Sequence, residues 1–286
     1  MNAFQIGARV FEGPGPFLMG VVNVTPDSFS DGGVYAERDA AVAGAERLLA
    51  EGADLVDLGG ESTRPGAQEV PADEEIRRVV PVVRALRARG CTAPISVDTR
   101  KAEVARAALD AGADLVNDVS ALADPALAAL VAERGAPVVL MHMRGTPADM
   151  ASRAVYGDVV GEVERELAAA LARAVALGVR EERILLDPGL GFAKKAEHSL
   201  ALLAALPRLR ARLGRPLLVG PSRKSFIGAV AGGAGAADRL PGTLAAVAAC
   251  VLAGVEYVRV HDVAAARQAA RVAAAIRDAS PSAGQG

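Results

Sequence analysis

The sequence predicts an α/β fold, a single (β/α)8 barrel, and two observations carry that prediction. Eight short runs rich in Val, Leu and Ile are spaced along the 286-residue chain, and a segment with helical apolar spacing follows each one. Strands that alternate with helices indicate βαβ units and a parallel sheet, and eight units close into a TIM barrel of about 250 residues. A doubly wound open sheet is the alternative, although it usually has fewer strands.

The elements follow one another regularly. The expected strands cover residues 17–23, 53–58, 94–98, 113–117, 137–142, 183–187, 216–220 and 255–260. The expected helices cover residues 37–51, 73–89, 101–110, 125–134, 157–177, 197–212, 237–253 and 263–277. Two of these helices run into a Gly-Ala-Asp-Leu-Val segment, whose glycine supplies the left-handed residue of a helix C-cap just before the next strand.

The length and the net charge of the chain limit which classes of protein it can belong to. Residues 1–286 are expected to form one domain, with a barrel core at about 16–277 and a frayed tail at 280–286, because no linker interrupts the chain before residue 280. Lys and Arg number 32 against 34 Asp and Glu, giving a net charge of −2, which argues against a nucleic-acid or acidic-membrane partner.

Cysteine usage and hydropathy indicate a cytoplasmic protein. Cys91 and Cys250 form no disulfide framework and no metal-binding CxxC spacing, which favours reduced thiols. The N-terminal residues lack the pattern of a signal peptide, and no apolar stretch reaches the ~18 residues that span a bilayer. We therefore expect no membrane partner.

Polar residues stand where the apolar runs end. They are Asn23, Asp57, Asp98, Asn117, His142, Asp187, Arg259 and His261. In a parallel barrel the carboxyl ends of the strands meet at one face, which holds the active site, so these residues are expected to converge on one pocket. The long loops after the first two strands, residues 23–36 and 59–72, and the segment after Met141 to about Tyr156 are candidates for mobile lids over it.

Both long loops carry groups that bind anions and cations. The segment NVTPDSFSDGG, residues 23–33, offers amide, hydroxyl and carboxylate oxygens for a hard cation, although a capped surface loop has the same composition. In DLGGESTRPGA, residues 57–67, two glycines allow the backbone to approach a ligand, and Arg64 can clamp an anion with two hydrogen bonds. The Pro-Gly pair there is also an ordinary turn signal.

Three strand-end residues suit a flat heterocycle with adjacent N–H donors: Asp98, Asn117 and Asp187. Each one alone could instead cap the following helix. The tight turn after Asp187 offers Phe192 as a wall of the pocket, and Met141 is expected to contact a ring. Its neighbour His142 is interpreted as a structural or pocket-lining residue.

The last two strands supply cationic groups. Lys224, one of only four lysines, lies in GPSRKSFIG and is placed to donate to a ring carbonyl or an anion, although a basic loop at a helix end is the simpler interpretation. Arg259 and His261 alternate along the last strand, so both face the same side. Phosphate sites in this fold usually lie after strands seven and eight, which favours binding of a pyrophosphate by this pair.

These segments together resemble the dihydropteroate synthase family of the folate pathway, which sulfonamides inhibit. NVTPDSFSDGG, DLGGESTRPGA, SVDTRK, LVNDVS, LMHMRGTP, LDPGLGF, SRKSFIG and RVHD occur in the family's order and span about residues 16–277. Leu190 is a small departure, where an aromatic or another apolar residue is common. The resemblance implies condensation of 6-hydroxymethyl-7,8-dihydropterin pyrophosphate with 4-aminobenzoate to 7,8-dihydropteroate and pyrophosphate.

The resemblance also implies a role for each matching residue. Asp98, Asn117, Met141, Asp187 and Lys224 would bind the pterin. Asn23, Arg259 and His261 would bind the pyrophosphate, with Asn23 also holding the cofactor Mg²⁺. The 4-aminobenzoate site would be framed by Thr63, Arg64, Pro65, Phe192 and Ser225.

The implied mechanism begins with C–O cleavage. A pterin carbocation would form, Asp31 would stabilise it, and Mg²⁺, Arg259 and His261 would neutralise the departing pyrophosphate. The first two loops would exclude water from the cation. Family members usually form homodimers, and the apolar last helices permit a dimer here.

Two other functions remain open from the sequence. A pterin-binding barrel that transfers a methyl group to a corrinoid protein would share the Asp98, Asn117 and Asp187 set, but it would have little use for Arg259 and His261. A non-catalytic pterin-binding homologue is the other alternative, although both long loops keep their polar residues.

Overall fold

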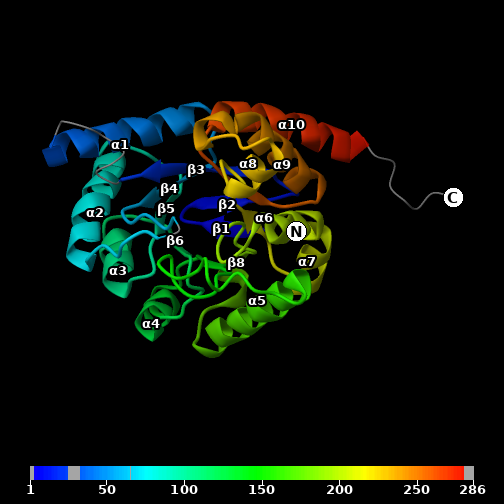
Figure 1. The fold of residues 1–286 in the computed structure, drawn as a ribbon. Helices are drawn as coiled ribbons and strands as arrows, with labels where there is room; N and C mark the ends of the chain where they lie inside the picture. The colour runs from blue at the N-terminus through cyan, green and yellow to red at the C-terminus, as the bar shows by residue number, and fades with distance from the viewer. Residues whose placement is uncertain (1–2, 25–32, 65, 280–286) are drawn as a thin grey trace.

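The computed structural model describes residues 3–24, 33–64 and 66–279. Within them, eight parallel strands form a barrel with helices around it (Figure 1). The strands are β3 (Phe17–Asn23), β4 (Leu55–Gly59), β5 (Ile95–Asp98), β6 (Leu115–Asp118), β7 (Val138–Met141), β8 (Ile184–Asp187), β9 (Leu218–Val219) and β10 (Tyr257–Val260). The eight expected strands are all confirmed.

The barrel closes at its shortest strand. The strands follow one another in the order β8-β7-β6-β5-β4-β3-β10-β9, and a parallel bridge from Leu186 to Leu217 joins the two ends of that series. Next to it, the Leu186 amide donates to the carbonyl of Pro216 at 3.1 Å. The barrel is thus continuous, and its closure relies on few ladder hydrogen bonds because β9 is only two residues long.

The helices lie where the apolar periodicity predicts them, except that one expected helix is divided into two. The confirmed helices are α1 (Gly33–Ala50), α2 (Ala72–Ala88), α3 (Ala102–Asp110), α4 (Pro125–Arg134), α5 (Val159–Ala176), α9 (Leu240–Leu252) and α10 (Val263–Ala279). The single helix expected at 197–212 is wrong. It is two helices, α6 (Ala196–Ala204) and α7 (Leu206–Leu213), because Pro207 cannot continue α6 and occupies the first turn of α7 instead.

One short helix and two short strands were not predicted from the sequence. A helix of six residues, α8 (Ser225–Val230), follows β9. At the N-terminus, β1 (Phe4–Ile6) and β2 (Arg9–Phe11) form an antiparallel hairpin. None of them was expected, because α8 is too short to show the helical period and FQI and RVF are not continuous apolar runs like those of the barrel strands.

The hairpin closes one end of the barrel. Its three buried apolar side chains pack with the inward-facing residues at the beginnings of the strands. That cluster contains Phe4, Ile6, Phe11, Met19, Leu55, Leu115, Val139, Leu185, Leu218 and Tyr257. The polar residues lie at the opposite end of the barrel, where the strands finish.

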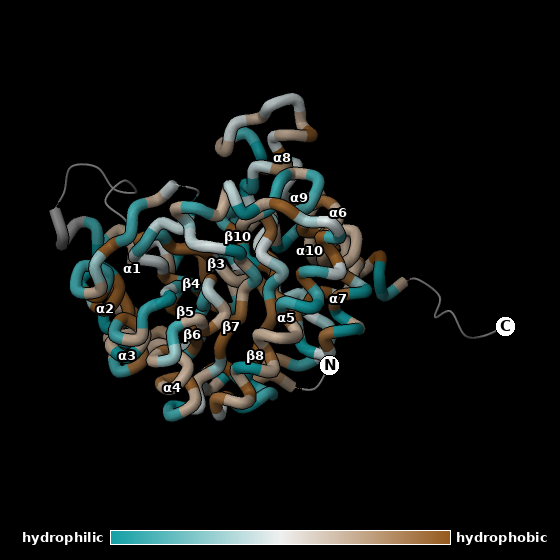
Figure 2. The backbone as a smooth tube through the Cα atoms, turned by 60° about the horizontal axis from the view of Figure 1, so that its bottom comes forward, coloured by the Kyte–Doolittle hydropathy of each residue, from teal (hydrophilic) through white to brown (hydrophobic). Residues whose placement is uncertain are grey.

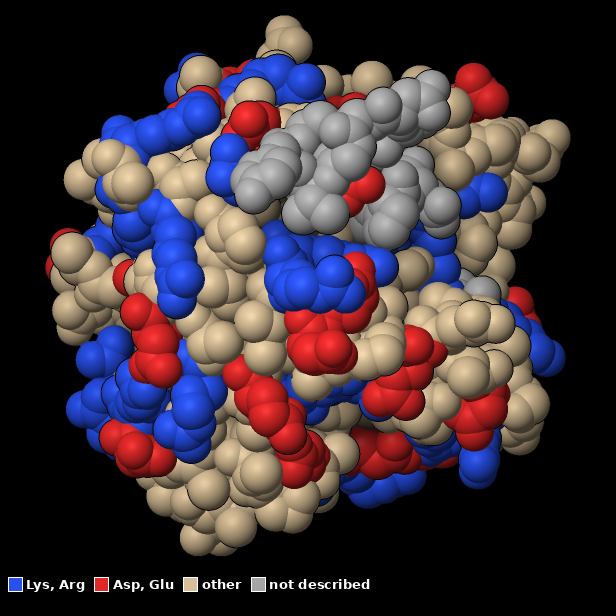
Figure 3. Space-filling model, turned by 90° about the vertical axis from the view of Figure 1, so that its left-hand side faces the viewer, with Lys and Arg blue, Asp and Glu red and all other residues tan. Residues whose placement is uncertain are grey.

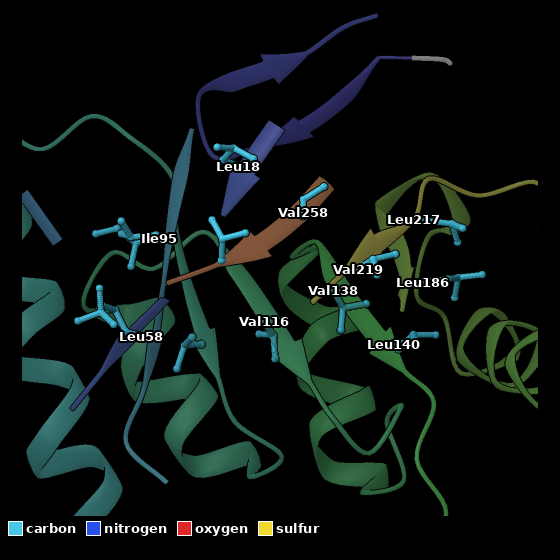
Figure 4. Packing of buried hydrophobic residues seen from close by; sticks show 14 of the residues in the cluster. Leu18, Leu58, Ile95, Val116, Val138, Leu140, Leu186, Leu217, Val219 and Val258 are labelled. Carbon is cyan, nitrogen blue, oxygen red and sulfur yellow. The ribbon is translucent and has the colours of Figure 1, made fainter. Parts of the chain in front are cut away.

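A second, larger cluster lies between strands and helices. Leu18, Val116, Leu140 and Val258 belong to it, and each is a neighbour in sequence of a residue that faces the barrel interior (Figure 4). Hydrophobic residues accordingly run along the strands inside the ring of helices (Figure 2). On the face drawn in Figure 3, acidic and basic side chains are interspersed.

Within the described residues, every helix is too short or too polar to cross a membrane.

The packing of the hairpin predicts a specific cost. Phe11 is buried, and the centroid of its ring lies 5.5 Å from that of Tyr257. Phe11→Ala should therefore lower the free energy of unfolding by about 3–5 kcal/mol. Urea denaturation measures this, and Val10→Ala, at a neighbouring position that is 50% exposed, should change it by less than about 0.5 kcal/mol. Equal effects of the two substitutions would show that the hairpin does not plug the barrel.

Candidate active site

A layer of mostly polar side chains lies inside the barrel above the apolar plug. Each sits two residues beyond an inward-facing residue of the same strand, so the period of two turns it toward the interior as well. The members are Asp57 on β4, Asp98 on β5, Asn117 on β6, Met141 on β7, Asp187 on β8 and Arg259 on β10. The structure thus brings the expected pterin-binding residues of the strands to one place, at the face that carries active sites in this fold.

Arg259 is the centre of a buried network. Its Nε donates to Asp57 Oδ2 at 2.7 Å, and its Nη2 donates to Asp98 Oδ2 at 2.9 Å. Asn117 Nδ2 donates to the same oxygen of Asp57 at 3.0 Å. The guanidinium was expected to serve a pyrophosphate, yet in this structure two of its nitrogens bind carboxylates.

Asp57 has a role that the sequence did not assign. It is fully buried, and one of its oxygens accepts from both Arg259 and Asn117. The signal was present, because Asp57 and Asn117 each follow the same Ala-Asp-Leu-Val segment. Equivalent positions on two strands of one barrel face the same interior, so the carboxylate and the amide were placed to meet.

The network shifts the ionisation of its members. Burial and the charge of Asp57 raise the pKa of Asp98 to about 7, although the charge of Arg259 opposes the shift. Burial alone would lower the pKa of Arg259, but the charges of Asp57 and Asp98 raise it, so the guanidinium stays charged. One cation therefore faces two carboxyls, of which Asp98 takes up a proton near neutral pH.

The turn after β8 fixes a third carboxyl and a cation. Asp187 Oδ1 accepts from the Gly189 amide at 2.7 Å, and burial raises the pKa of Asp187 to about 6 against that bond and the charge of Lys224. The Lys224 Nζ lies 4.0 Å from the ring centroid of Phe192. Burial lowers the pKa of Lys224 to about 8, while Asp187 opposes the shift.

His261 contributes a hydrogen bond rather than a charge. Its Nδ1 lies 3.0 Å from Ser222 Oγ, and burial together with the charge of Arg259 lowers its pKa to about 4. The imidazole is thus neutral near pH 7. The expectation that His261 shares the neutralisation of an anion with Arg259 stays a prediction.

The remaining expected residues lie on the loops. Asn23 is exposed at the end of β3, Arg64 is exposed on the loop after β4, and Thr63 beside it is half-buried. Ser225 is exposed at the start of α8. Asp31 and Pro65 lie outside the described residues.

Two sets of contacts hold the loop after β4, one from Lys101 and one from the loop after β7. Lys101 Nζ donates to the Val70 carbonyl at 2.6 Å and to Glu75 Oε2 at 2.8 Å, and it also pairs with Glu61. The Gly66 amide donates to the carbonyl of Pro147 at 2.9 Å, which joins this loop to the one after β7. Thr63 and Arg64 are therefore carried on a loop with fixed ends.

No group of three His, Cys, Asp or Glu side chains within residues 3–24, 33–64 and 66–279 is arranged to hold a metal ion. The expected ligand Asn23 is an amide and stands at the edge of the described part of its loop. A magnesium ion that keeps several waters and binds substrate phosphates needs only one or two protein oxygens, so Asn23 fits such an ion.

The fold and the inward-facing layer define a class of protein, a barrel enzyme that binds a flat, nitrogen-rich heterocycle at its carboxyl-end face. Residues 19–261 match the model of the pterin-binding enzyme family. A dihydropteroate synthase of Synechocystis is 46% identical over 273 residues, covering 95% of this chain and 94% of that protein. The chain belongs to the dihydropteroate synthase family.

Solved structures of dihydropteroate synthases have a similar fold. Xanthomonas albilineans dihydropteroate synthase with 4-aminobenzoic acid has a TM-score of 0.90 and 47% identity, covering 98% of this chain and 99% of that one. The dihydropteroate synthase of the same organism in complex with 7,8-dihydropteroate has a TM-score of 0.86 and 44% identity, covering 98% and 100%. These matches favour the synthase over the methyl-transfer and non-catalytic alternatives.

The shifted pKa values predict a bell-shaped pH dependence of pterin binding. Asp98 and Asp187 accept hydrogen bonds best when ionised, so affinity should fall as the pH drops through their pKa values of about 7 and about 6, respectively. Lys224 loses its proton above a pKa of about 8, so affinity should fall again there. Calorimetric titration of a hydroxymethyl-dihydropterin without pyrophosphate, between about pH 5 and pH 9, keeps phosphate ionisation out of the measurement.

The two limbs of that profile have separate origins. Lys224→Met should remove the alkaline fall and leave the acid fall in place. A flat profile in the unsubstituted protein would contradict the assignment of these groups to the pterin site.

Proposed function

We propose that this barrel condenses 6-hydroxymethyl-7,8-dihydropterin pyrophosphate with 4-aminobenzoate and releases pyrophosphate. The observation that carries the proposal is the inward-facing set of Asp98, Asn117, Asp187 and Lys224 at one end of the barrel. The related Xanthomonas proteins with 4-aminobenzoic acid and with 7,8-dihydropteroate support the same substrates and product.

The inward-facing set matches the edge of a pterin. Carboxylate and amide oxygens accept from ring and exocyclic N–H groups, and the Lys224 ammonium donates to a ring carbonyl. Burial makes such hydrogen bonds stronger than in water, and it leaves the empty site with poorly solvated charges. A ligand with the complementary pattern is therefore favoured over one that lacks it.

The reaction breaks one bond and forms another at the same carbon. The C–O bond of the exocyclic methylene breaks, the electron pair leaves with pyrophosphate, and the arylamine nitrogen forms the new C–N bond and then loses its proton. The pterin ring stabilises a carbocation-like centre, and the neutral arylamine needs no strong base. Asp31 on the first loop is proposed to stabilise the cation.

The departing pyrophosphate needs donors and positive charge. Arg259 has five N–H donors, and the nitrogens Nε and Nη2 already serve carboxylates, so its other donors remain for phosphate oxygens. His261 adds a neutral hydrogen bond and Asn23 an amide. Asn23 would hold Mg²⁺, which offsets negative charge on the leaving group when bound.

The arylamine site is proposed to lie between Phe192 and the second loop. Thr63, Arg64 and Pro65 would frame one side, and Ser225 would lie across from them. Arg64 is exposed on its loop in this structure, so closure of that loop would complete the site.

The test is release of pyrophosphate from the dihydropterin pyrophosphate, with and without 4-aminobenzoate and Mg²⁺. Release that requires Mg²⁺ and is accompanied by dihydropteroate is expected. Asp187→Asn should weaken pterin binding by about 1–3 kcal/mol, because an amide N–H would face a ligand N–H. Tight pterin binding with no release under any of these conditions would contradict the proposal.

We further propose that the functional unit is a homodimer joined through α9 and α10. The outer faces of these packed helices carry Leu252, which is 49% exposed, and Val272, which is 57% exposed. A shallow groove between them is lined mostly by apolar side chains such as Leu244 and Ala248. Contact with a second copy of the same face would bury this surface symmetrically.

The dimer predicts a selective effect of charge. Val272→Arg should convert the protein from dimer to monomer in sedimentation equilibrium, since a buried unpaired guanidinium opposes association. Val155→Arg is the matched control, because Val155 is 73% exposed on the loop after β7. A monomeric unsubstituted protein, or loss of the dimer in both variants, would refute this interface.

A further inference from the structure

A buried lysine outside the proposed chemistry lies behind the turn that carries Phe192. Lys194 is only 7% exposed. Its Nζ lies 2.9 Å from the carbonyl of Phe192, 3.2 Å from the carbonyl of His142 and 2.8 Å from His142 Nδ1. Burying an ammonium is costly, so these three partners must compensate for the lost water.

The hydrogens of this cluster can be assigned from the chemistry of its members. Glu166 Oε2 lies 2.9 Å from His142 Nε2, and a carboxylate accepts, so Nε2 carries the imidazole hydrogen. Nδ1 is then an acceptor for Lys194. Burial and the charge of Lys194 lower the pKa of His142 to about 4, which agrees with a neutral ring. Burial lowers the pKa of Lys194 to about 7, and below that pH the three acceptors match the three N–H bonds of one ammonium.

This ammonium joins two loops at the mouth of the barrel. His142 directly follows β7, and Phe192 lies in the turn after β8. The two segments are in close contact already, since a Cβ built on Gly189 would lie 2.0 Å from the His142 carbonyl oxygen. Lys194 Nζ bridges the same two segments, because it donates to the carbonyls of both His142 and Phe192.

The position of that backbone determines what Phe192 and Lys224 can do. The Lys224 ammonium lies 4.0 Å from the centroid of the Phe192 ring. The Lys224 stem passes over Gly191, where a Cβ would lie 3.3 Å from Cδ. A shift of the Phe192 carbonyl would therefore move both the aromatic wall and the cation beside it.

We propose that Lys194 is a positioning residue that fixes the Phe192 ring, and through it the Lys224 ammonium, for the incoming arylamine. This inference rests on the proposed function for its substrate, but the contact it describes exists without substrate. Other contacts hold the turn in the fold, because Tyr156 donates to the Ala193 carbonyl at 3.0 Å and Gly191 donates to Ser199 Oγ at 3.2 Å. Replacing Lys194 should therefore loosen the ring rather than unfold the barrel.

The first arm of the test needs no catalysis. The chain has four lysines, so ¹⁵N labelling of lysine gives at most four side-chain ammonium signals. At about pH 6, where the ammonium groups are protonated, the Lys224 signal should sense the ring current of Phe192. Lys194→Met should shift it, while Lys195→Met, which alters the exposed neighbouring lysine, should leave it in place.

The second arm is kinetic. Lys194→Met should raise the KM for 4-aminobenzoate by about tenfold, as expected for loss of about 1.4 kcal/mol of ordering. The Kd for the dihydropterin pyrophosphate should change less, because the hydrogen bonds that hold Asp98, Asn117 and Asp187 do not involve Lys194 and only Lys224 is shared by the two sites. Lys194→Gln keeps two N–H donors, so its KM should fall between those of the unsubstituted protein and Lys194→Met, and it carries the test if Lys194→Met does not fold.

The outcomes separate this inference from the proposed function. An unshifted Lys224 signal in the Lys194 variants, or equal loss of arylamine and pterin binding, would overturn the positioning role. The same change in Lys195→Met would overturn it as well. If the unsubstituted protein made no dihydropteroate, the proposed function would fail, and the NMR arm would still decide whether Lys194 fixes Phe192.

Discussion

The buried ion pair of Arg259 with Asp57 and Asp98 is the interaction on which the rest of the site depends. It ties β10 to β4 and β5 across the intervening β3, and Asn117 extends it to β6. Taking these charges out of water costs several kcal/mol per ion, and removing one partner would leave another charge unpaired. The arrangement is thus poorly explained by stability alone and well explained by a site that must present fixed, partly unsatisfied polar atoms.

The electrostatics of the barrel mouth follow from the same burial. Burial raises the pKa of Asp98 and Asp187 and lowers the pKa of Lys224 and Lys194. The pKa values of these acids and bases therefore all move toward the neutral range. Among the described residues, Asp57 Oδ1 is buried without a hydrogen-bond partner. Unsatisfied acceptors of this kind are costly when the site is empty, and a ligand that supplies N–H donors recovers that energy.

Much of this organisation can be predicted from the local sequence, because continuous apolar runs mark the buried strands and apolar residues recur at helical spacing in the helices. The eight barrel strands and the polar residues at their ends were predictable for that reason. The pairing of Asp57 with Arg259 was not, since it joins residues 202 positions apart, and neither was the contact of Lys194 with His142, which depends on how two loops meet. The hairpin was not predicted, because its strands FQI and RVF are not continuous apolar runs. The positions of Asp31 and Pro65 stay untested, because both lie outside the described residues.

Asp98 is the carboxyl through which Arg259 and the proposed pterin site are coupled. Arg259 Nη2 donates to Asp98 Oδ2, so a second donor can bind the other oxygen of the same carboxyl. Such a donor favours the ionised form of Asp98, whose pKa of about 7 lies close to neutral pH, and it thereby changes the charge beside the guanidinium. Because linkage is reciprocal, an anion that binds Arg259 changes the pKa of Asp98 in turn. Under the proposed function, the buried network thus couples recognition of the two halves of one substrate.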